Sequence, residues 1–598
     1  MELEQLGNWQ RTTMCGDLRS DDIGKEQILM GWINNRRDHG GVIFCDLRDY
    51  TGISQIVFAT QHSKEAFEKA DRIRSEFVLA VRGEITKRDP ETINPKMVTG
   101  EIELHVKELK ILNMCNQLPF QISDDQQDIG EKTRLKYRTL DLRRPVMQRI
   151  LMMRSKAAHV VRNFFFNKKF FEIETPVLTK STPEGARDFL VPSRVNAGCF
   201  YALPQSPQLF KQLLMVGGYD RYFQIVKCFR DEDLRGNRQP EFTQIDIELS
   251  FTNQGEIINL MNEMIADLFK KTIDYEVSLP IPQMTYDEAI DKYGSDAPDL
   301  RFDLTLIDLS AIAADCGFQV FSGAVKKGGI VKAIMVPGGA TFSRKDLDDL
   351  TDFVKIYQAK GMAYVKIKED GWQSPIAKFF TQEEIDQINE QTGAKVGDLI
   401  LFGADTKKIV HDALGNLRKE IARKTGLIED NTFKFTWVTD FPLFDYDEEE
   451  DRYTSSHHPF TMPVQTDLDK WENGDLSKIK SVAFDLVLNG VELGGGSVRI
   501  HRKDIQEKIF KLLNLSEEES KAKFGFFMDA LEQGAPPHGG LAFGFDRIMM
   551  FLAKTDSIRD VIAFPKTQQA ACLLTSAPSK VDKEQLRDLN ISLRKAKS

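Results

Sequence analysis

The chain has 598 residues, of which 41% are hydrophobic, and a formal net charge of −10 at pH 7. This length predicts three or four domains, because a single hydrophobic core rarely extends beyond ~250–300 residues. No apolar run approaches the ~18 residues of a membrane-spanning helix, and the polar, acidic start, MELEQLGNWQR, argues against a signal peptide. The acidic balance argues against nonspecific nucleic-acid binding by the whole surface, but it is compatible with a local basic groove.

Seven cysteines are scattered along the chain without a CxxC pair. This pattern indicates free thiols in a reducing compartment rather than disulfides or a structural zinc site. We therefore expect a cytoplasmic protein that does not associate with a membrane.

Residues 1–113 predict a β-rich domain. The strand candidates are QILMGWIN, GVIFCDLRD, ISQIVFA, FVLAVRGEIT and EIELHVKEL, with a helical stretch, HSKEAFEKADRIR, between the third and fourth. Five strands with a helix at this position predict an OB-fold barrel, whose face commonly binds single-stranded nucleic acid. A basic turn containing Arg37 and His39 precedes Phe44, which would combine phosphate attraction with base stacking. From the residues alone, a core phenylalanine beside solvated arginines is the simpler alternative.

Residues 114–144 predict a hinge. An acidic run, Asp124, Asp125 and Asp128, precedes a basic one, KTRLKYRTLDLRR. Two interpretations of the basic run stay open: a helix along a nucleic-acid backbone, or a solvated connector.

Residues 145–290 predict the first part of a second domain. A long apolar helix, VMQRILMMRSKAAHVVRNFFFNKKF, leads into a strand, FEIETPVL, over residues 171–178, a combination that suits a subunit interface. A loop with Glu184 and Arg187 follows, and a loop carboxylate is usually solvated. The polar run QSPQ then opens a short amphipathic helix that carries Lys211.

Residues 222–230 and 241–251 predict the two strands of an antiparallel hairpin around a charged turn. A purely structural hairpin would keep its charges at the tip, whereas this one carries Arg230, Asp246 and Glu248 within or beside its strands. Charges in these positions are costly unless they bind something, so the hairpin predicts a binding site.

Residues 291–430 change in character and predict an α+β insertion, to which we assign no chemistry. The second domain resumes over residues 431–570. There His457 and His458 are adjacent, and because neighbours on a strand point to opposite faces, zinc is improbable. Asp485 and Glu492 flank a turn at Gly490, and a pair of carboxylates on a hairpin suits Mg²⁺. Residues 571–598 predict a C-terminal extension with a peripheral helix or partial disorder.

Several motifs resemble those of a known family. FRDEDLR followed by RQPEFTQ resembles the strand-loop-strand ATP site of class II aminoacyl-tRNA synthetases, and GLAFGFDR, ending at Arg547, resembles their second nucleotide element. FEIETPVL resembles their dimer-interface element. QSPQLFK and GGGSVRIH are similar to the bacterial branch of the aspartyl-tRNA synthetases within that family.

The resemblance implies a multidomain α+β protein: an N-terminal OB-fold β-barrel, an antiparallel-sheet catalytic domain of the class II type, and an α+β insertion. It implies that ATP and L-aspartate form an aspartyl-adenylate, whose aspartyl group passes to tRNA(Asp). It also implies Mg²⁺ as cofactor and a homodimer. No protein nucleophile is needed, since the substrate carboxylate itself attacks the α-phosphate.

The resemblance also assigns roles to residues. The catalytic residues would be Arg230, Arg547 and Glu492, and the metal ligands Asp485 and Glu492. The nucleotide would meet Arg230, Asp231, Glu232, Gln239, Phe242, Glu492, Gly544, Phe545, Asp546 and Arg547, with the adenine between Arg547 and Phe242. Aspartate would meet Glu184, Ser206, Gln208, Lys211, Arg230, Asp246, His457, His458 and Arg499. Lys211 and Arg499 would face its side-chain carboxylate, so a neutral asparagine would leave one buried cation unpaired.

In the barrel, the resemblance implies that Phe44 stacks on the middle anticodon base, that Gln55 reads it, and that Arg37 and His39 contribute to tRNA binding. Strictly tRNA(Asp)-specific bacterial enzymes tend to have leucine at the position of His39, and relaxed ones histidine. We therefore favour an enzyme that also charges tRNA(Asn), with strict tRNA(Asp) specificity as the alternative.

Other functions fit these residues less well. Lysine specificity would need an acidic pocket where Lys211 and Arg499 stand, and asparagine specificity would not need both cations. A noncatalytic OB-fold RNA-binding paralogue would have no reason to keep Arg230, Glu492 and Arg547. An asparagine synthetase on the same fold would have no reason to carry the barrel.

Overall fold

The computed structural model describes residues 2–122, 129–182, 185–234, 237–429, 431–448 and 450–594. The chain divides into two compact units: residues 1–154 with 559–579, and residues 155–558 with 580–598. The acidic run over residues 124–128 lies outside the described residues. The finer domain boundaries inferred from the sequence stay predictions. Among the described helices, none combines the length and apolar character needed to cross a membrane.

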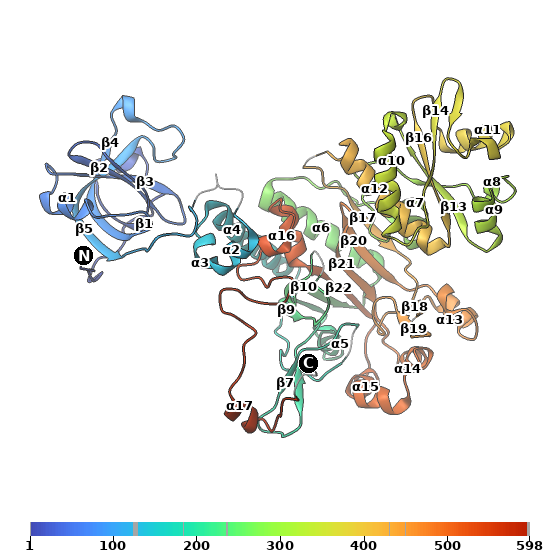
Figure 1. The fold of residues 1–598 in the computed structure, drawn as a ribbon. Coiled ribbons are helices and arrows are strands. Elements are labelled where there is room, and N and C mark those ends of the chain that lie inside the picture. The colour runs from blue at the N-terminus through green and yellow to red at the C-terminus, as the bar shows by residue number, and fades with distance from the viewer. Residues whose placement is uncertain are drawn as a thin grey trace. The chain divides into compact units, whose positions relative to one another are not determined.

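The first unit contains a closed five-stranded barrel in the order β1-β2-β3-β5-β4 (Figure 1). Its elements are β1 (Glu26–Asp38), β2 (Val42–Arg48), β3 (Ile53–Ala59), α1 (Lys64–Ala70), β4 (Val78–Lys87) and β5 (Ile102–Asn113). The helix lies between the third and fourth strands, and a bulge between Ile33 and Asn35 bends the long first strand. This arrangement confirms the predicted OB-fold barrel.

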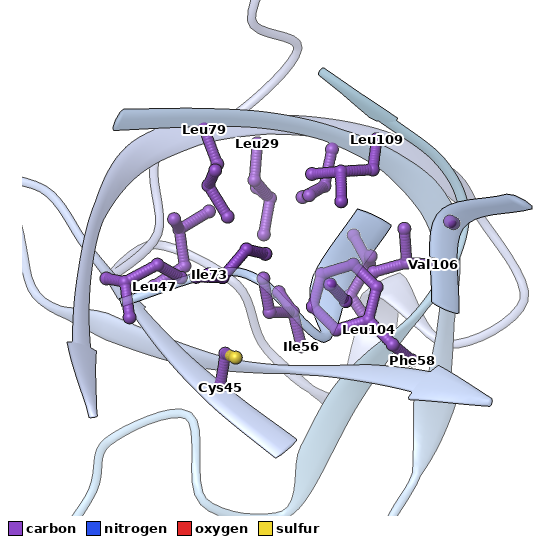
Figure 2. Close-up of a cluster of buried hydrophobic side chains, with 14 of the residues drawn as sticks. Leu29, Cys45, Leu47, Ile56, Phe58, Ile73, Leu79, Leu104, Val106 and Leu109 are labelled. Atoms are coloured by element: carbon purple, nitrogen blue, oxygen red, sulfur yellow. The ribbon is translucent and has the colours of Figure 1, made fainter. Parts of the chain in front are cut away.

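Inward-facing residues of the five strands fill the barrel (Figure 2). Leu29, Leu79 and Leu109 come from β1, β4 and β5, while Ile56 and Phe58 come from β3. Alternation along each strand leaves the intervening side chains outside, so one face of the barrel can carry polar and aromatic residues.

The first unit also contains α2 (Glu131–Lys136), α3 (Arg138–Asp141) and the start of α4 (Pro145–Asn167). Arg138, in the basic run, is buried: it forms an ion pair with Asp141 and donates to the carbonyl oxygen of Ile562 at 2.8 Å. At least this arginine therefore stabilises the fold and is not available to a nucleic-acid backbone.

An eight-stranded sheet forms the centre of the second unit, in the order β11-β17-β20-β21-β22-β10-β9-β6. Its strands are β6 (Phe171–Glu172), β9 (Arg221–Phe229), β10 (Glu241–Ser250), β11 (Gln283–Thr285), β17 (Phe435–Thr439), β20 (Ala483–Leu488), β21 (Val491–Val498) and β22 (His538–Gly544). Neighbouring strands are antiparallel except for the two outermost pairs, β11 with β17 and β6 with β9. The predicted catalytic sheet is therefore confirmed.

The strand predicted over residues 171–178 is much shorter than expected. Only Phe171 and Glu172 pair with β9, and the chain then runs in irregular structure through Pro176. Pro176 lacks the N–H that a ladder requires, so the strand could not have run through to residue 178.

The insertion folds as a module of three layers around the sheet β12-β13-β16-β14-β15 (Figure 1). The strands are β12 (Leu306–Asp308), β13 (Ile330–Val336), β14 (Ala363–Lys368), β15 (Gly371–Gln373) and β16 (Leu399–Asp405). The buried side chains of α10 (Arg344–Lys355) and α12 (Lys407–Thr425) pack on one face of the sheet. Those of α8 (Ser310–Ala313), α9 (Gln319–Lys326) and α11 (Gln382–Thr392) pack on the other. This is the predicted α+β insertion.

The second unit contains further helices and strands outside these two sheets. They are β7 (Leu190–Pro192), β8 (Phe200–Ala202), α5 (Gln208–Val216), α6 (Gln254–Ile273), α7 (Tyr286–Tyr293), β18 (Phe444–Asp447), β19 (Arg452–Ser455), α13 (Gln465–Trp471), α14 (Lys503–Leu512), α15 (Glu517–Leu531), α16 (Phe545–Leu552) and α17 (Lys583–Asp588). Of these, α5 and α16 position residues of the candidate site.

Candidate functional site

A cavity of about 480 Å³ lies in the second unit, against β10, β21, β22 and the start of α5. Most of the site residues predicted from the sequence line it, although they come from segments far apart in the chain. They are Ser206, Gln208, Lys211, Arg230, Glu232, Gln239, Phe242, Asp246, His457, His458, Asp485, Glu492, Arg499, Gly544, Asp546 and Arg547.

Three predicted residues do not belong to this set. Glu184 lies outside the described residues. Asp231 lines a neighbouring depression together with Arg187, and Phe545 is buried and does not line the cavity. The roles assigned to these three stay predictions.

The alternation of β10 places Asp246 and Glu248 on the same face of the sheet, two residues apart. Opposite them on β22 lie two small residues, Ala542 and Gly540. A Cβ atom at Gly540 would stand 2.3 Å from Glu248 Oε2, so glycine is needed there to make room for the carboxylate. The strand pairing therefore creates the space in which the two carboxylates lie.

Two cations and two carboxylates form a buried network beneath the cavity. Lys211 Nζ donates to Asp246 Oδ1 at 2.7 Å and lies 3.3 Å from Glu248. Arg499 holds Glu248 with Nε and Nη2, at 3.0 and 3.3 Å. The structure thus modifies the expectation that both cations await a substrate carboxylate, because protein carboxylates already pair them. The sequence analysis noted Glu248 in the hairpin but did not assign it to the site; its spacing of two from Asp246 was the available signal.

One carboxylate oxygen of Asp246 is not used by the buried network. Burial raises the pKa of Asp246 to about 6, against the opposing effect of Lys211. Its Oδ2 atom and the Nε2 atom of Gln208 have no hydrogen-bond partner among the described residues. An unsatisfied buried carboxylate oxygen at a cavity wall suits a cationic group of a ligand.

His458 supports Arg499 from the other side. Arg499 Nη1 lies 2.6 Å from His458 Nε2, so this ring nitrogen acts as the acceptor. Burial and the Arg499 charge hold the pKa of His458 well below its usual range. A neutral imidazole is therefore the form that fits beside the guanidinium.

His457 contacts the other part of the cavity. Its Nε2 atom lies 3.1 Å from Asp485 Oδ1, and although burial opposes it, the Asp485 charge raises the pKa of His457. The expectation that adjacent histidines point to opposite faces is wrong here. Residues 456–458 form a bend rather than a strand, so both rings line the cavity.

Asp485 and Glu492 face the cavity from the β20–β21 hairpin. A Cβ atom at Gly495 would lie 2.2 Å from Asp485 Oδ1, so this glycine leaves space for the carboxylate. Desolvation at the cavity wall and the nearby Asp485 charge raise the pKa of Glu492, although its side chain is still 47% exposed to solvent. Two carboxylates that disfavour each other's charge suit a hard divalent cation, which would relieve the repulsion. Among the described residues no group of three or more metal-binding side chains occurs, so such a cation would need further oxygen ligands from a substrate or water.

Elsewhere on the cavity wall, the Arg230 guanidinium lies 5.0 Å from the centroid of the Phe242 ring. Arg547 instead donates to the carbonyl oxygen of Glu492 at 2.7 Å. The face of Phe242 is thus occupied by a different arginine from the one expected. An aromatic ligand stacking on that face would require Arg230 to move, which would bring its charge towards the ligand's other groups.

Asp546 serves the fold itself. Its Oδ2 atom accepts from the backbone N–H of Thr243 at 2.8 Å and so connects the start of α16 to β10. Glu232 forms an ion pair with Arg238 at 2.9 Å.

In the first unit, the predicted tRNA-binding residues lie together on the barrel. Arg37 contacts Asp46 and Gln55, at 3.1 Å each, and Gln55 in turn donates to Glu103 at 2.7 Å. The Phe44 ring is partly exposed and meets the exposed His39 ring edge-on, with centroids 5.8 Å apart. Phe44 is thus not a core residue, which removes the simpler alternative.

Comparison with known proteins finds matches that together cover nearly the whole chain. Residues 130–568 match the family model for tRNA synthetases class II (D, K and N), and residues 28–112 match that for OB-fold nucleic acid binding domains. A protein of Syntrophotalea carbinolica named Aspartate--tRNA(Asp/Asn) ligase is 58% identical over 98% of this chain and 99% of its own length. One of the same name from Geotalea uraniireducens is 56% identical, over 98% and 99%.

Solved structures share the fold at low identity. A Pyrococcus horikoshii asparaginyl-tRNA synthetase complexed with asparaginyl-adenylate matches with a TM-score of 0.59 and 17% identity, over 93% of this chain and 98% of its own. A Leishmania major structure described as a putative aspartyl-tRNA synthetase matches with a TM-score of 0.58 and 17% identity, over 94% and 96%.

Proposed function

Because the chain belongs to the class II tRNA synthetases (D, K and N), we propose that it attaches L-aspartate to tRNA at the expense of ATP, through an aspartyl-adenylate. The observation that carries this proposal is the buried Lys211–Asp246–Glu248–Arg499 network at the cavity wall. The relatives at 58% and 56% identity, which bear the name of an aspartate–tRNA ligase, support it over nearly the whole chain.

The network suits both ends of aspartate. Lys211 and Arg499 meet the side-chain carboxylate, while the free Oδ2 of Asp246 takes the ammonium group, with Gln208 and Ser206 beside it. Before substrate binds, the two cations are balanced by Asp246 and Glu248, so their burial is tolerated. Bound aspartate adds its ammonium charge beside Asp246 and its carboxylate beside the cations. Asparagine lacks that second charge, which makes it the poorer ligand.

In the first step, the α-carboxylate of aspartate attacks the α-phosphorus of ATP. A C–O–P bond forms, the bond to the β-phosphate oxygen breaks, and pyrophosphate leaves. The protein contributes orientation and charge cancellation. Arg230 holds the α-phosphate and the substrate carboxylate, Arg547 faces the terminal phosphate, and Phe242, Glu232 and Gln239 line the nucleotide.

Asp485 and Glu492 would hold Mg²⁺, which neutralises phosphate charge when it is bound. Desolvation and the Asp485 charge raise the pKa of Glu492, and a cation between the two carboxylates would relieve their repulsion. His457 competes for Asp485 through its hydrogen bond.

The barrel recognises the anticodon, with Phe44 stacking on a base and with Gln55 oriented by Arg37 and Glu103 to read it. We infer that tRNA(Asn) is charged as well as tRNA(Asp). The name shared by the relatives, which includes both tRNAs, and the presence of His39 support this inference.

The active form is a homodimer in the cytoplasm. Large apolar side chains at Phe166, Phe171 and Phe251 are 77%, 58% and 72% exposed in the single chain and are therefore available to a second copy. All seven cysteines carry free thiols, which fits a reducing compartment.

ATP–pyrophosphate exchange with each of aspartate, asparagine and lysine tests the proposal. Exchange that depends on aspartate alone is expected. Exchange driven better by asparagine or lysine, or no exchange with any of the three, would overturn the assignment of the amino acid or of the activity.

A further inference from the structure

The turn of the β20–β21 hairpin lies where both connections to the insertion module pass. Asn489 and Gly490 form this turn, with positive φ angles of 51° and 81°. The hairpin's two strands carry Asp485 and Glu492, four residues before and three residues after Asn489. The conformation of the turn therefore contributes, together with the strand pairing, to the separation of the two carboxylates.

The connection that leaves the insertion holds the turn by its side chain. Asn489 Nδ2 donates to the carbonyl oxygen of Thr432 at 2.7 Å, and Asn489 Oδ1 accepts from the N–H of Lys434 at 2.9 Å. The backbone N–H of Asn489 also donates to the carbonyl oxygen of Lys434, at 3.2 Å.

The connection that enters the insertion packs on the same turn. A Cβ atom at Gly490 would lie 3.0 Å from Asp299 Cβ, so the two backbones are in close contact. Asp299 is in turn held by the insertion: Arg418, fully buried in α12, donates to the carbonyl oxygens of Asp299, Phe302 and Leu304, at 3.0, 3.2 and 2.8 Å. The Phe302 ring lies 4.4 Å from the same guanidinium.

We propose that the insertion module positions the Asp485–Glu492 pair. Asn489 is the positioning residue, because its side chain links the turn to the segment that leaves the module. Arg418 donates hydrogen bonds to the entering connection, and that connection packs against Gly490. The leaving connection forms hydrogen bonds with the Asn489 side chain. The turn is thus held from two sides, by the entering segment that Arg418 binds and by the first residues that follow the insertion. This inference rests on the proposed metal role of the two carboxylates and gives the insertion a part in the reaction without any chemistry of its own.

Asn489→Gly tests the inference cleanly, because glycine accepts the left-handed backbone and removes only the two side-chain bonds. The matched control is Asn514→Gly, at an exposed asparagine with φ of 59° for which no side-chain bond is present among the described residues. We expect Asn489→Gly to raise the Mg²⁺ concentration for half-maximal ATP–pyrophosphate exchange about tenfold, the low end of what loss of outer support costs a metal site. Calorimetric titration of Mg²⁺ into enzyme that holds a nonhydrolysable ATP analogue, where no reaction takes place, should show the same loss of affinity. The KM for aspartate should not change, and Asn514→Gly should match the wild type.

Gly490→Ala provides a second variant, since its methyl group would press on Asp299. Its control is Gly534→Ala, which has a similar φ of 88° but no atom within 4 Å of the added Cβ. Wild-type Mg²⁺ dependence in both Asn489→Gly and Gly490→Ala would overturn the inference. Asp485→Asn separates the two hypotheses: if it too leaves the Mg²⁺ titration unchanged, the proposed metal role itself is wrong.

Discussion

Arg499 and Glu248 form a two-contact ion pair beneath the cavity, and both side chains are almost completely buried. The same guanidinium donates to Ser497 Oγ at 2.7 Å and to the carbonyl oxygen of Gly540 at 3.0 Å. Arg499 is therefore fixed before substrate arrives, and the cost of orienting it does not fall on the binding step.

Arg499→Leu is expected to abolish aspartate activation while ATP binding stays nearly intact. The substitution removes a contact to the substrate carboxylate and leaves Glu248 buried with only Lys211 as a partner, which costs roughly 3–5 kcal/mol. Aspartate-dependent exchange measures the loss, and equilibrium binding of ATP measures what remains.

Arg502→Leu is the control for that variant, because Arg502 is exposed and, within the described part of the chain, forms an ion pair only with its neighbour Asp504. It should behave as the wild type. Near-normal exchange in Arg499→Leu would sink the assignment of Arg499 to the aspartate pocket.

The pH dependence of aspartate activation should report on Asp246. Burial raises the pKa of this carboxyl to about 6, so it takes up a proton as the pH falls through that value. A protonated carboxyl cannot balance the substrate ammonium. The kcat/KM for aspartate should therefore fall below pH ~6 with a slope approaching one decade per unit, since kcat/KM reports groups of the free enzyme.

The KM for ATP serves as the internal comparison, because Asp246 does not lie at the nucleotide end. A kcat/KM for aspartate that stays flat between pH 5 and 7 (about the range in which a group of this pKa titrates) would show that Asp246 does not receive the ammonium group. The pH dependence of folding stability follows from the same pKa shift. Since the folded pKa is above the unfolded one, protonation of Asp246 stabilises the folded state as the pH falls from 6 towards its ordinary range.

Local patterns were sufficient for much of the fold. Alternating apolar residues predicted the five barrel strands, and the charged hairpin at Arg230 and Asp246 was visible because charges within strands need a partner. The sequence predicted a longer strand than β6, because residues 171–178 are rich in β-forming residues. The missing N–H of Pro176 was given too little weight in that prediction.

Contacts between distant segments could not be predicted from local sequence patterns. The pairing of Glu248 with Arg499 joins residues 251 positions apart, and it depends on the register of β10 with β22. The convergence of His457 and His458 on one cavity depends on a bend that no periodicity marks. Such relationships arise from tertiary packing, which overrides local expectation.

Glu492→Gln should raise the Mg²⁺ requirement and slow adenylate formation much more than it weakens aspartate binding. The change removes one charge from the pair while preserving its shape, so the cavity stays intact. The measurement is exchange rate as a function of Mg²⁺, with Glu507→Gln on the exposed face of α14 as a control. An unchanged titration would remove Glu492 from the metal site.

The last prediction concerns which tRNA is charged, and it rests on His39. The anticodons of the two tRNAs differ at a single base, so discrimination must come from contacts near the anticodon. His39 is exposed and its ring stands edge-on to Phe44, the expected stacking platform, at a centroid distance of 5.8 Å. An imidazole can donate or accept a hydrogen bond and can stack, whereas leucine offers only shape.

Both purified tRNAs should therefore be aminoacylated with the wild type and with His39→Leu. We expect the wild type to charge tRNA(Asp) and tRNA(Asn), and the variant to lose tRNA(Asn) preferentially while its ATP–pyrophosphate exchange, which needs no tRNA, is unchanged. Negligible charging of tRNA(Asn) by the wild type would show that the enzyme is strictly specific. If both enzymes charge the two tRNAs in the same ratio, a solvated loop histidine is the correct interpretation, and the determinant lies elsewhere on the barrel, with Glu103 as the next residue to test because it orients Gln55.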